Sequence, residues 1–184
     1  MKKLQTDEII RMSVAEFREA EKIPVVVVLD NIRSQHNIGS VFRTADAFRV
    51  EAVHLCGITA MPPSREIQKT ALGATESVEW KYFDSTIQSV SKLREAGYHI
   101  VSIEQASGSI MVQDFTPEKG KYALVLGNEV HGIDDDVINL SDICLEIPQA
   151  GTKHSLNIAV AAGIVLWEFF GKLNGFKMSG ENPD

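Results

Sequence analysis

Short apolar runs alternate with amphipathic stretches along most of this sequence. The β-branched run at 25–29 is typical of a strand that is buried on both faces of a sheet. Similar runs predict five further strands, at 52–56, 78–83, 99–103, 122–126 and 143–147. Strands that alternate with helices indicate an α/β fold with a mostly parallel sheet flanked by helices.

Apolar residues at helical spacing predict the helices between these strands. Helices are expected at about 5–22, 38–48 and 66–72, between Asp84 and Gly97, and at about 155–173. Ser13 and Glu16 have the spacing of a capping box within the first of them, a short N-terminal extension. Asn37 and Asp84 are expected to cap the second and fourth helices, and Gly97 should end the fourth in a left-handed conformation.

The length and composition fit one soluble globular domain over residues 1–184, with a frayed tail at about 178–184. The two cysteines form no metal-ligand spacing and suit a reducing compartment, so no metal site is expected. The longest apolar stretch, 158–170, contains Glu168 and is too short to span a bilayer. No signal-peptide pattern is present. We therefore predict a cytoplasmic protein without membrane contact.

The net charge of -7 and the pI near 5.3 argue against a protein that holds nucleic acid by bulk charge alone. Contact with nucleic acid would need positive charge concentrated around one site. Alternatively, dimerisation could bring two basic patches together.

Three loops are expected at the carboxyl ends of strands, where ligands bind to open parallel sheets. They lie at 30–37, 127–132 and 148–154, and they are rich in Gly, Asn, His and basic residues. The dinucleotide-binding, phosphate-loop, zinc-protease and nucleophile-elbow motifs are absent. A flavodoxin-like nucleotide binder is therefore a weak alternative, and the predicted site is where the three loops meet.

Each loop also has an ordinary structural explanation. Asn37 stands at a helix start that favours an anion, but a simple N-cap would look the same. Glu129 lies between two glycines in a segment that could be an ordinary turn. Ser155 and Asn157 begin an apolar helix, and either one could be a simple cap. Taken singly, no loop decides the function.

Taken together, the loops resemble the SpoU (TrmH-like) branch of the SPOUT RNA methyltransferases over about residues 24–170. The matching motifs are Asn37-x-Gly39-x-x-x-Arg43, Leu126-Gly127-x-Glu129-x-x-Gly132 and Ile147-Pro148-x-x-Gly151-x-x-x-Ser155-Leu156-Asn157. The resemblance implies a parallel sheet whose C-terminal segment is threaded into a trefoil knot. It also implies S-adenosylmethionine as cofactor, a homodimer formed partly by the last helix, and methyl transfer to a ribose 2'-hydroxyl of RNA.

The resemblance assigns site residues by motif position. Those expected at the cofactor are Gly127, Ile147, Leu156, Ile103 and Glu104. Those expected to be catalytic or to shape the reacting centre are Arg43, Asn37, Glu129, Ser155 and Asn157. Those expected to contact RNA are Arg33, His36, Lys153 and His154. Because arginine almost never loses its proton, we interpret Arg43 as orienting a phosphate and stabilising the developing alkoxide.

The RNA substrate is less strongly indicated than the reaction. The short chain resembles tRNA-modifying members of the family, and the form Ile147-Pro148-Gln149 with Lys153 is similar to tRNA guanosine enzymes. A tRNA guanosine is therefore the favoured target. The alternatives are an rRNA 2'-O-methyltransferase and a non-catalytic RNA-binding protein with the same fold, which the acidic charge would favour.

Overall fold

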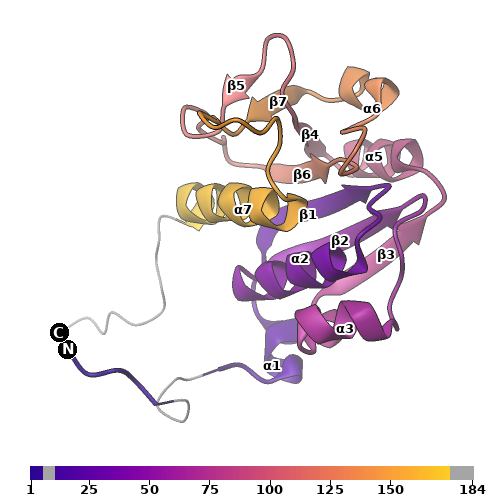
Figure 1. Ribbon diagram of the computed structural model, residues 1–184. Helices are drawn as coiled ribbons and strands as arrows, with labels where there is room; N and C mark the ends of the chain where they lie inside the picture. The colour runs from indigo at the N-terminus through magenta and orange to yellow at the C-terminus, as the bar shows by residue number, and fades with distance from the viewer. Residues whose placement is uncertain (6–10, 175–184) are drawn as a thin grey trace.

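The computed structural model describes residues 1–5 and 11–174. Its centre is a sheet of seven parallel strands in the order β3-β2-β1-β6-β4-β7-β5 (Figure 1). The strands are β1 Ile23–Asp30, β2 Val50–Cys56, β3 Glu79–Phe83, β4 Tyr98–Ile103, β5 Ile110–Met111, β6 Lys121–Leu126 and β7 Ile143–Glu146. The predicted α/β class with a mostly parallel sheet is confirmed.

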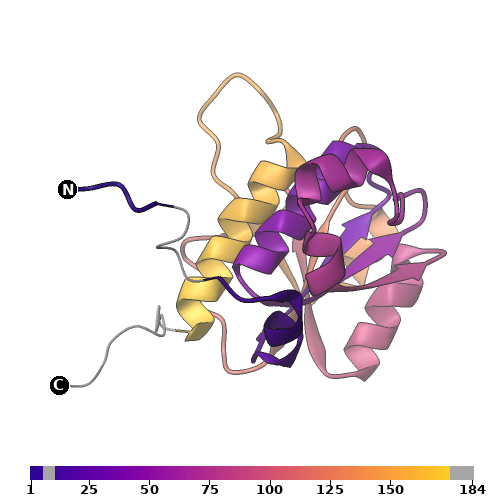
Figure 2. The ribbon, with the colours of Figure 1, turned by 90° about the horizontal axis from the view of Figure 1, so that it is seen from below.

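Helices cover both faces of this sheet (Figure 2). They are α1 Val14–Glu19, α2 Gln35–Ala47, α3 Arg65–Ala71, α4 Ala74–Ser77, α5 Thr86–Glu95, α6 Asp135–Asn139 and α7 Ile158–Asn174. Within the described residues, none is long and apolar enough to cross a membrane. The proposed frayed tail at 178–184 and part of the proposed N-terminal extension, 6–10, lie outside the described residues.

The central strand β1 shows why the hydrophobic pattern predicted a doubly covered sheet. Val25, Val27 and Leu29 pack in the cluster that includes α2 and α7, whereas Val26 and Val28 pack in the cluster that includes α5 and α6. All five side chains are buried. A strand whose alternate residues face two helical layers needs apolar residues at every position, which is the pattern of a parallel sheet.

The helix starts confirm one prediction and correct two. Ser13 and Glu16 form the predicted capping box of α1, but the expected helix at about 5–22 is too long, because among the described residues of this range only Val14–Glu19 are helical. The cap of α2 is Ser34, whose hydroxyl accepts the N–H of Asn37, and the cap of α5 is Ser85 rather than Asp84. In both corrected helices a serine hydroxyl reaches the N–H three residues further on. Asn37 therefore lies in the first turn of α2, with its side chain available for other contacts.

The last helix begins later than predicted. α7 starts at Ile158, and the Asn157 side chain accepts the N–H of Ala159 at 2.9 Å, so Ser155 lies before the helix. The short elements α4, α6 and β5 were not predicted, because two to five residues carry too little periodicity. The predicted left-handed end of α5 at Gly97 is confirmed by its φ of 82°.

The connection from β7 to α7 crosses the carboxyl edge of the sheet. β7 pairs with β4 on the side away from β6, whereas α7 packs against α2 and β1 (Figure 1). The segment at 147–157 must therefore run back past β4 and β6. Such a crossing is a precondition of the trefoil knot that the family resemblance implies, and the knot itself stays a prediction.

Candidate active site

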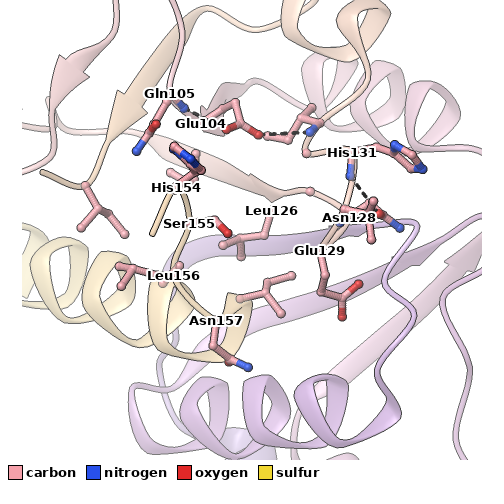
Figure 3. A pocket seen from close by; sticks show the side chains of 18 of the residues that line it. Glu104, Gln105, Leu126, Asn128, Glu129, His131, His154, Ser155, Leu156 and Asn157 are labelled. Atoms are coloured by element: carbon pink, nitrogen blue, oxygen red, sulfur yellow. Dashed lines mark hydrogen bonds between the residues drawn. The ribbon is translucent and has the colours of Figure 1, made fainter. Parts of the chain in front are cut away.

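The segments that follow β1, β4 and β6 meet beyond the carboxyl ends of these central strands. β1 pairs with β6 and β6 with β4, so the segments that follow these strands leave the sheet at one edge. The strand order switches direction at this point, which is where open α/β sheets bind ligands. A cavity of about 700 Å³ lies here between the segments that follow β4, β6 and β7 (Figure 3).

Most of the residues predicted for the site line this cavity. All five residues predicted for the cofactor do so: Ile103, Glu104, Gly127, Ile147 and Leu156. Four further predicted residues also line it: Glu129, His154, Ser155 and Asn157. The predicted residues outside its lining are Arg33, His36, Asn37, Arg43 and Lys153. Figure 3 shows Glu104 and His154 toward one end of the cavity, and Glu129 and Asn157 toward the other.

Asn37 joins the site through hydrogen bonds, although it does not line the cavity. Its side-chain N–H group donates to Glu129 Oε1 at 3.2 Å, and its side-chain oxygen accepts from Asn157 Nδ2 at 3.0 Å. One residue from each of the three matching motifs thus takes part in a single chain of contacts. These residues are 92 and 120 positions apart along the sequence.

The Glu129 carboxylate lies at the start of α2. The backbone N–H groups of Arg33 and Ser34 each donate to it at 3.1 Å. Partial burial raises the pKa of Glu129, but these N–H groups, together with the Asn37 amide, outweigh the burial and hold the pKa below its usual value. The anion expected at this helix start is therefore the protein's own carboxylate, which remains ionised at neutral pH.

Asn128 organises the turn that carries Glu129. Its side-chain oxygen accepts the N–H groups of Val130 and His131 at 2.8 and 3.1 Å, and its Nδ2 donates to the carbonyl of Asn31 at 2.6 Å. The side chain therefore shapes the turn after β6 and also ties it to the segment after β1. An asparagine at the head of a glycine-bounded turn is a signal for such bonds, although not for their distant partner.

Gly127 and Gly132 allow this turn to close on itself. A Cβ at Gly127 would lie 2.3 Å from the backbone of Gly132. Gly132 has a φ of 70°, and a Cβ there would lie 2.4 Å from Glu104 Oε2. That oxygen accepts the N–H of Ile133 at 3.2 Å, so Glu104 holds the far end of the turn. Gly127 is required because the backbone of Gly132 lies close to it, and Gly132 is favoured because its φ is in the left-handed region.

A buried carboxylate lies beneath these loops. Asp30 is 1% exposed and accepts hydrogen bonds from the Thr86 hydroxyl, from Asn31 Nδ2 and from the N–H of Asp134. Burial raises its pKa, while the hydrogen bonds act in the opposite direction. It ties the end of β1 to α5 and to the start of α6. Nothing in the local sequence marks it as different from other residues at strand ends.

Except for His154, the predicted basic residues lie outside the lining of the cavity. Arg33, Arg43 and Lys153 are exposed, and the His36 ring lies 3.0 Å from the Glu66 carboxylate of α3. Gly39 permits this approach of the two helices, since a Cβ there would lie 2.2 Å from the Ile67 carbonyl oxygen. The structure therefore does not bring Arg43 into the cavity of its own chain.

Several residues that line the cavity were not predicted. The polar ones are Gln105, Asn128, His131, Asp135 and Gln149. Gln105 lies two residues after the end of β4, so the rule about strand ends could have identified it. Among the described residues no group of three or more His, Cys, Asp or Glu could hold a metal ion.

The fold and the cavity define an α/β ligand-binding protein whose site lies at the strand-order switch of a parallel sheet. The cavity volume is in the range for a small ligand, and its walls combine apolar side chains with glycine backbone. The model of the SpoU rRNA Methylase family matches residues 24–167. The chain belongs to this family.

Individual proteins show the same relationship. The chain is 32% identical over 145 residues to the 23S rRNA (guanosine-2'-O-)-methyltransferase RlmB of Neisseria meningitidis, covering 79% of this chain and 57% of that protein. The AdoMet-bound rRNA methyltransferase from Sinorhizobium meliloti superposes with a TM-score of 0.76 at 30% identity, covering 83% of this chain and 59% of that one. A structure described for the 2-OH methylation of C/U34 on tRNA has a TM-score of 0.72 at 27% identity. The match covers 82% of this chain and 97% of that one. The chain spans about three fifths of the length of the curated relatives it matches.

Proposed function

We propose that this protein transfers a methyl group from S-adenosylmethionine to a ribose 2'-hydroxyl of RNA. The observation that carries the proposal is the contact chain Asn157–Asn37–Glu129 beside the cavity. It joins three motif residues in a chain that belongs to the SpoU family. The AdoMet-bound relative supports the choice of cofactor.

The cavity residues fit S-adenosylmethionine. Ile147 and Leu156 offer apolar surface, and Gly127 offers backbone that a ligand can approach closely. Ile103 ends β4 and Glu104 follows it, and Figure 3 shows Glu104 at the opposite end of the cavity from Asn157. When bound, the cofactor supplies an electrophilic methyl group on a positively charged sulfur.

The protein's own residues must align the hydroxyl and assist loss of its proton, since a neutral ribose hydroxyl is a poor nucleophile. In the proposal, Glu129 fixes the start of α2, and Asn37 and Asn157 hold the reacting edge of the cavity. The Ser155 hydroxyl lines the cavity and offers a hydrogen bond to the ribose. Arg43, outside the cavity, orients the phosphate of the target nucleotide. The remaining RNA contacts are assigned to Arg33, His36, Lys153 and His154.

We favour tRNA as the substrate, with guanosine as the target. The structure described for 2-OH methylation of C/U34 on tRNA is matched along 97% of its chain, which supports tRNA, whereas guanosine rests on the Ile147-Pro148-Gln149 motif with Lys153. An rRNA substrate is the second candidate, because two of the relatives described above are rRNA enzymes. A non-catalytic RNA-binding role is the third, and the two asparagines and the ionised Glu129 argue against it because they form an ordered polar network.

We also propose a homodimer that forms through α7, in the cytoplasm. Val160 and Trp167 are each 51% exposed on the mostly apolar helix α7, and two exposed apolar side chains one heptad apart favour a surface that a second copy covers. The two free cysteines, Cys56 and Cys144, fit a reducing compartment.

The decisive experiment incubates the purified protein with radiolabelled S-adenosylmethionine and with bulk tRNA or rRNA in separate reactions. Label recovered from tRNA as a 2'-O-methyl nucleoside would support the proposal, and label only in rRNA would replace the substrate. Arg43→Ala should abolish transfer and leave cofactor affinity by calorimetry nearly unchanged. Cofactor binding without label in either RNA would favour the non-catalytic role.

A further inference from the structure

The loop between β2 and α3, residues 57–64, presents two large apolar side chains to solvent. Ile58 is 65% exposed and Met61 is 47% exposed. A single exposed apolar residue is normal on a protein surface, but two on one eight-residue loop beside a functional site need an explanation.

This loop is anchored along the edge of the candidate active site. At its start, the N–H of Ile58 donates to Asn31 Oδ1 at 3.1 Å. At its end, the Ser64 hydroxyl donates to the side chain of Gln35, the first residue of α2. The loop therefore runs beside the segment whose backbone binds Glu129, and its exposed side chains lie on the α2 side of the site.

Positive charge is concentrated in the same part of the chain. Residues 31–70 contain five Lys or Arg against three Asp or Glu, whereas the rest of the chain contains 13 against 22. Two of the three acidic residues form hydrogen bonds with residues outside this part of the chain. Asp46 accepts from the Ser77 hydroxyl, and Glu51 accepts from the Tyr98 hydroxyl. An acidic protein thus keeps a locally basic surface beside its site, which is what contact with a polyanion requires.

Two exposed arginines flank the loop. Arg33 precedes α2, and Arg65 is the first residue of α3. The Ser64 hydroxyl bonds to the Gln35 side chain, so the start of α3 lies beside the start of α2 and both arginines lie at the same edge of the molecule. Neither forms an ion pair with another residue among 1–5 and 11–174, so both are available to phosphates.

We propose that Arg33, Ile58, Met61 and Arg65 form a flanking surface that holds the nucleotides next to the methylated one. The arginines contact phosphates, and the two apolar side chains pack against the face of a base. A base presents its face only when it is unstacked, so the target lies in a single-stranded loop or bulge and not inside a duplex. The inference rests on the proposed function and extends it to the shape of the substrate.

The test uses the full chain and fluorescently labelled tRNA transcripts that the wild-type protein methylates. Arg65→Gln should raise the Kd for tRNA roughly three- to tenfold. It should also reduce the magnitude of the negative slope of log K against log salt by about 0.7 to 0.9. The double variant Ile58→Ser with Met61→Ser should raise the Kd about fivefold without changing that slope. Cofactor affinity and kcat should stay at the wild-type values, because none of these residues lines the cavity.

Matched controls come from distant surfaces. Lys119→Gln removes a positive charge before β6, at the opposite edge of the sheet. Ile87→Ser removes an apolar side chain of similar exposure, 41%, from α5 on the other face. Neither should change the Kd for tRNA.

Three outcomes would overturn the inference. Wild-type RNA affinity in both test variants, with methylation intact, would reject the flanking surface and leave the proposed function standing. Undiminished methylation after the tRNA is annealed to a complementary strand would reject the single-stranded target. A change of oligomeric state in the double variant, without loss of RNA affinity, would assign the apolar pair to contact between copies of this chain. Failure of the wild-type protein to bind any RNA would instead reject the proposed function.

Discussion

Replacing Glu129 with glutamine tests whether the carboxylate holds the site together. The carboxylate accepts from the backbone of Arg33 and Ser34 and from Asn37. Glutamine keeps one acceptor oxygen but turns an N–H₂ group toward one of these donors. A hydrogen bond to a charged group contributes about 1.5–3 kcal/mol, and exposure of Glu129 reduces this to roughly 1–2 kcal/mol.

This loss should appear in catalysis more than in cofactor binding. If alignment at the start of α2 depends on Glu129, a change of about 1–2 kcal/mol lowers kcat roughly 5- to 30-fold. Single-turnover methylation of tRNA measures this effect, with calorimetry for cofactor affinity and urea unfolding for stability. Glu95→Gln, a substitution of an exposed carboxylate at the end of α5, is the matched control.

The same carboxylate predicts a dependence on pH. Because the pKa of Glu129 is held below the usual glutamate value of 4.5, the ionised form stabilises the folded state above that pH. The contribution is lost as the pH falls through the lower folded-state pKa. The difference in unfolding free energy between the wild type and Glu129→Gln should therefore shrink as the pH falls below 4.5. A constant difference from neutral to acidic pH, together with wild-type kcat in the variant, would refute the reasoning.

Three further substitutions test the packing that shapes the site. Gly39→Ala should lower the free energy of unfolding by about 1–3 kcal/mol in urea titrations, since its Cβ would meet the Ile67 carbonyl; an unchanged midpoint would show that α3 moves away freely. Gly132→Ala should weaken cofactor binding by calorimetry, and Gly108→Ala, with similar φ but open space, separates the clash with Glu104 from backbone strain. Asn128→Ala should raise amide exchange in the turn after β6; wild-type exchange would contradict its organising role.

Local patterns predicted what depends on local physics. The run at 25–29 predicted a doubly buried strand, and the capping-box spacing of Ser13 and Glu16 predicted the start of α1, because each signal is complete within a few residues. The cap of α2 shows the limit of such signals. Ser34 and Asn37 are both good capping residues three positions apart, and only the backbone geometry decides between them.

The site was predictable as a meeting of loops but not as a network of contacts. Strand ends placed Glu129 and Asn157 in the right region, since carboxyl ends of parallel strands share one edge. The bond from Asn157 to Asn37 and the placement of Arg43 outside the cavity depend on how distant segments pack. Asp30 was missed because its three partners come from α5, from its neighbour in sequence and from the start of α6.

The contact between Asn157 and Asn37 spans 120 positions, and this span matters during synthesis. A nascent chain that has exposed β1, β6 and the Glu129 turn still lacks Asn157 and the helix that follows it. Domains fold from the N-terminus as they leave the ribosome, so the sheet can form well before the reacting edge is complete. Under the proposed function, the polypeptide therefore stays catalytically silent until Asn157 and α7 have been translated, and shorter products have no activity toward RNA.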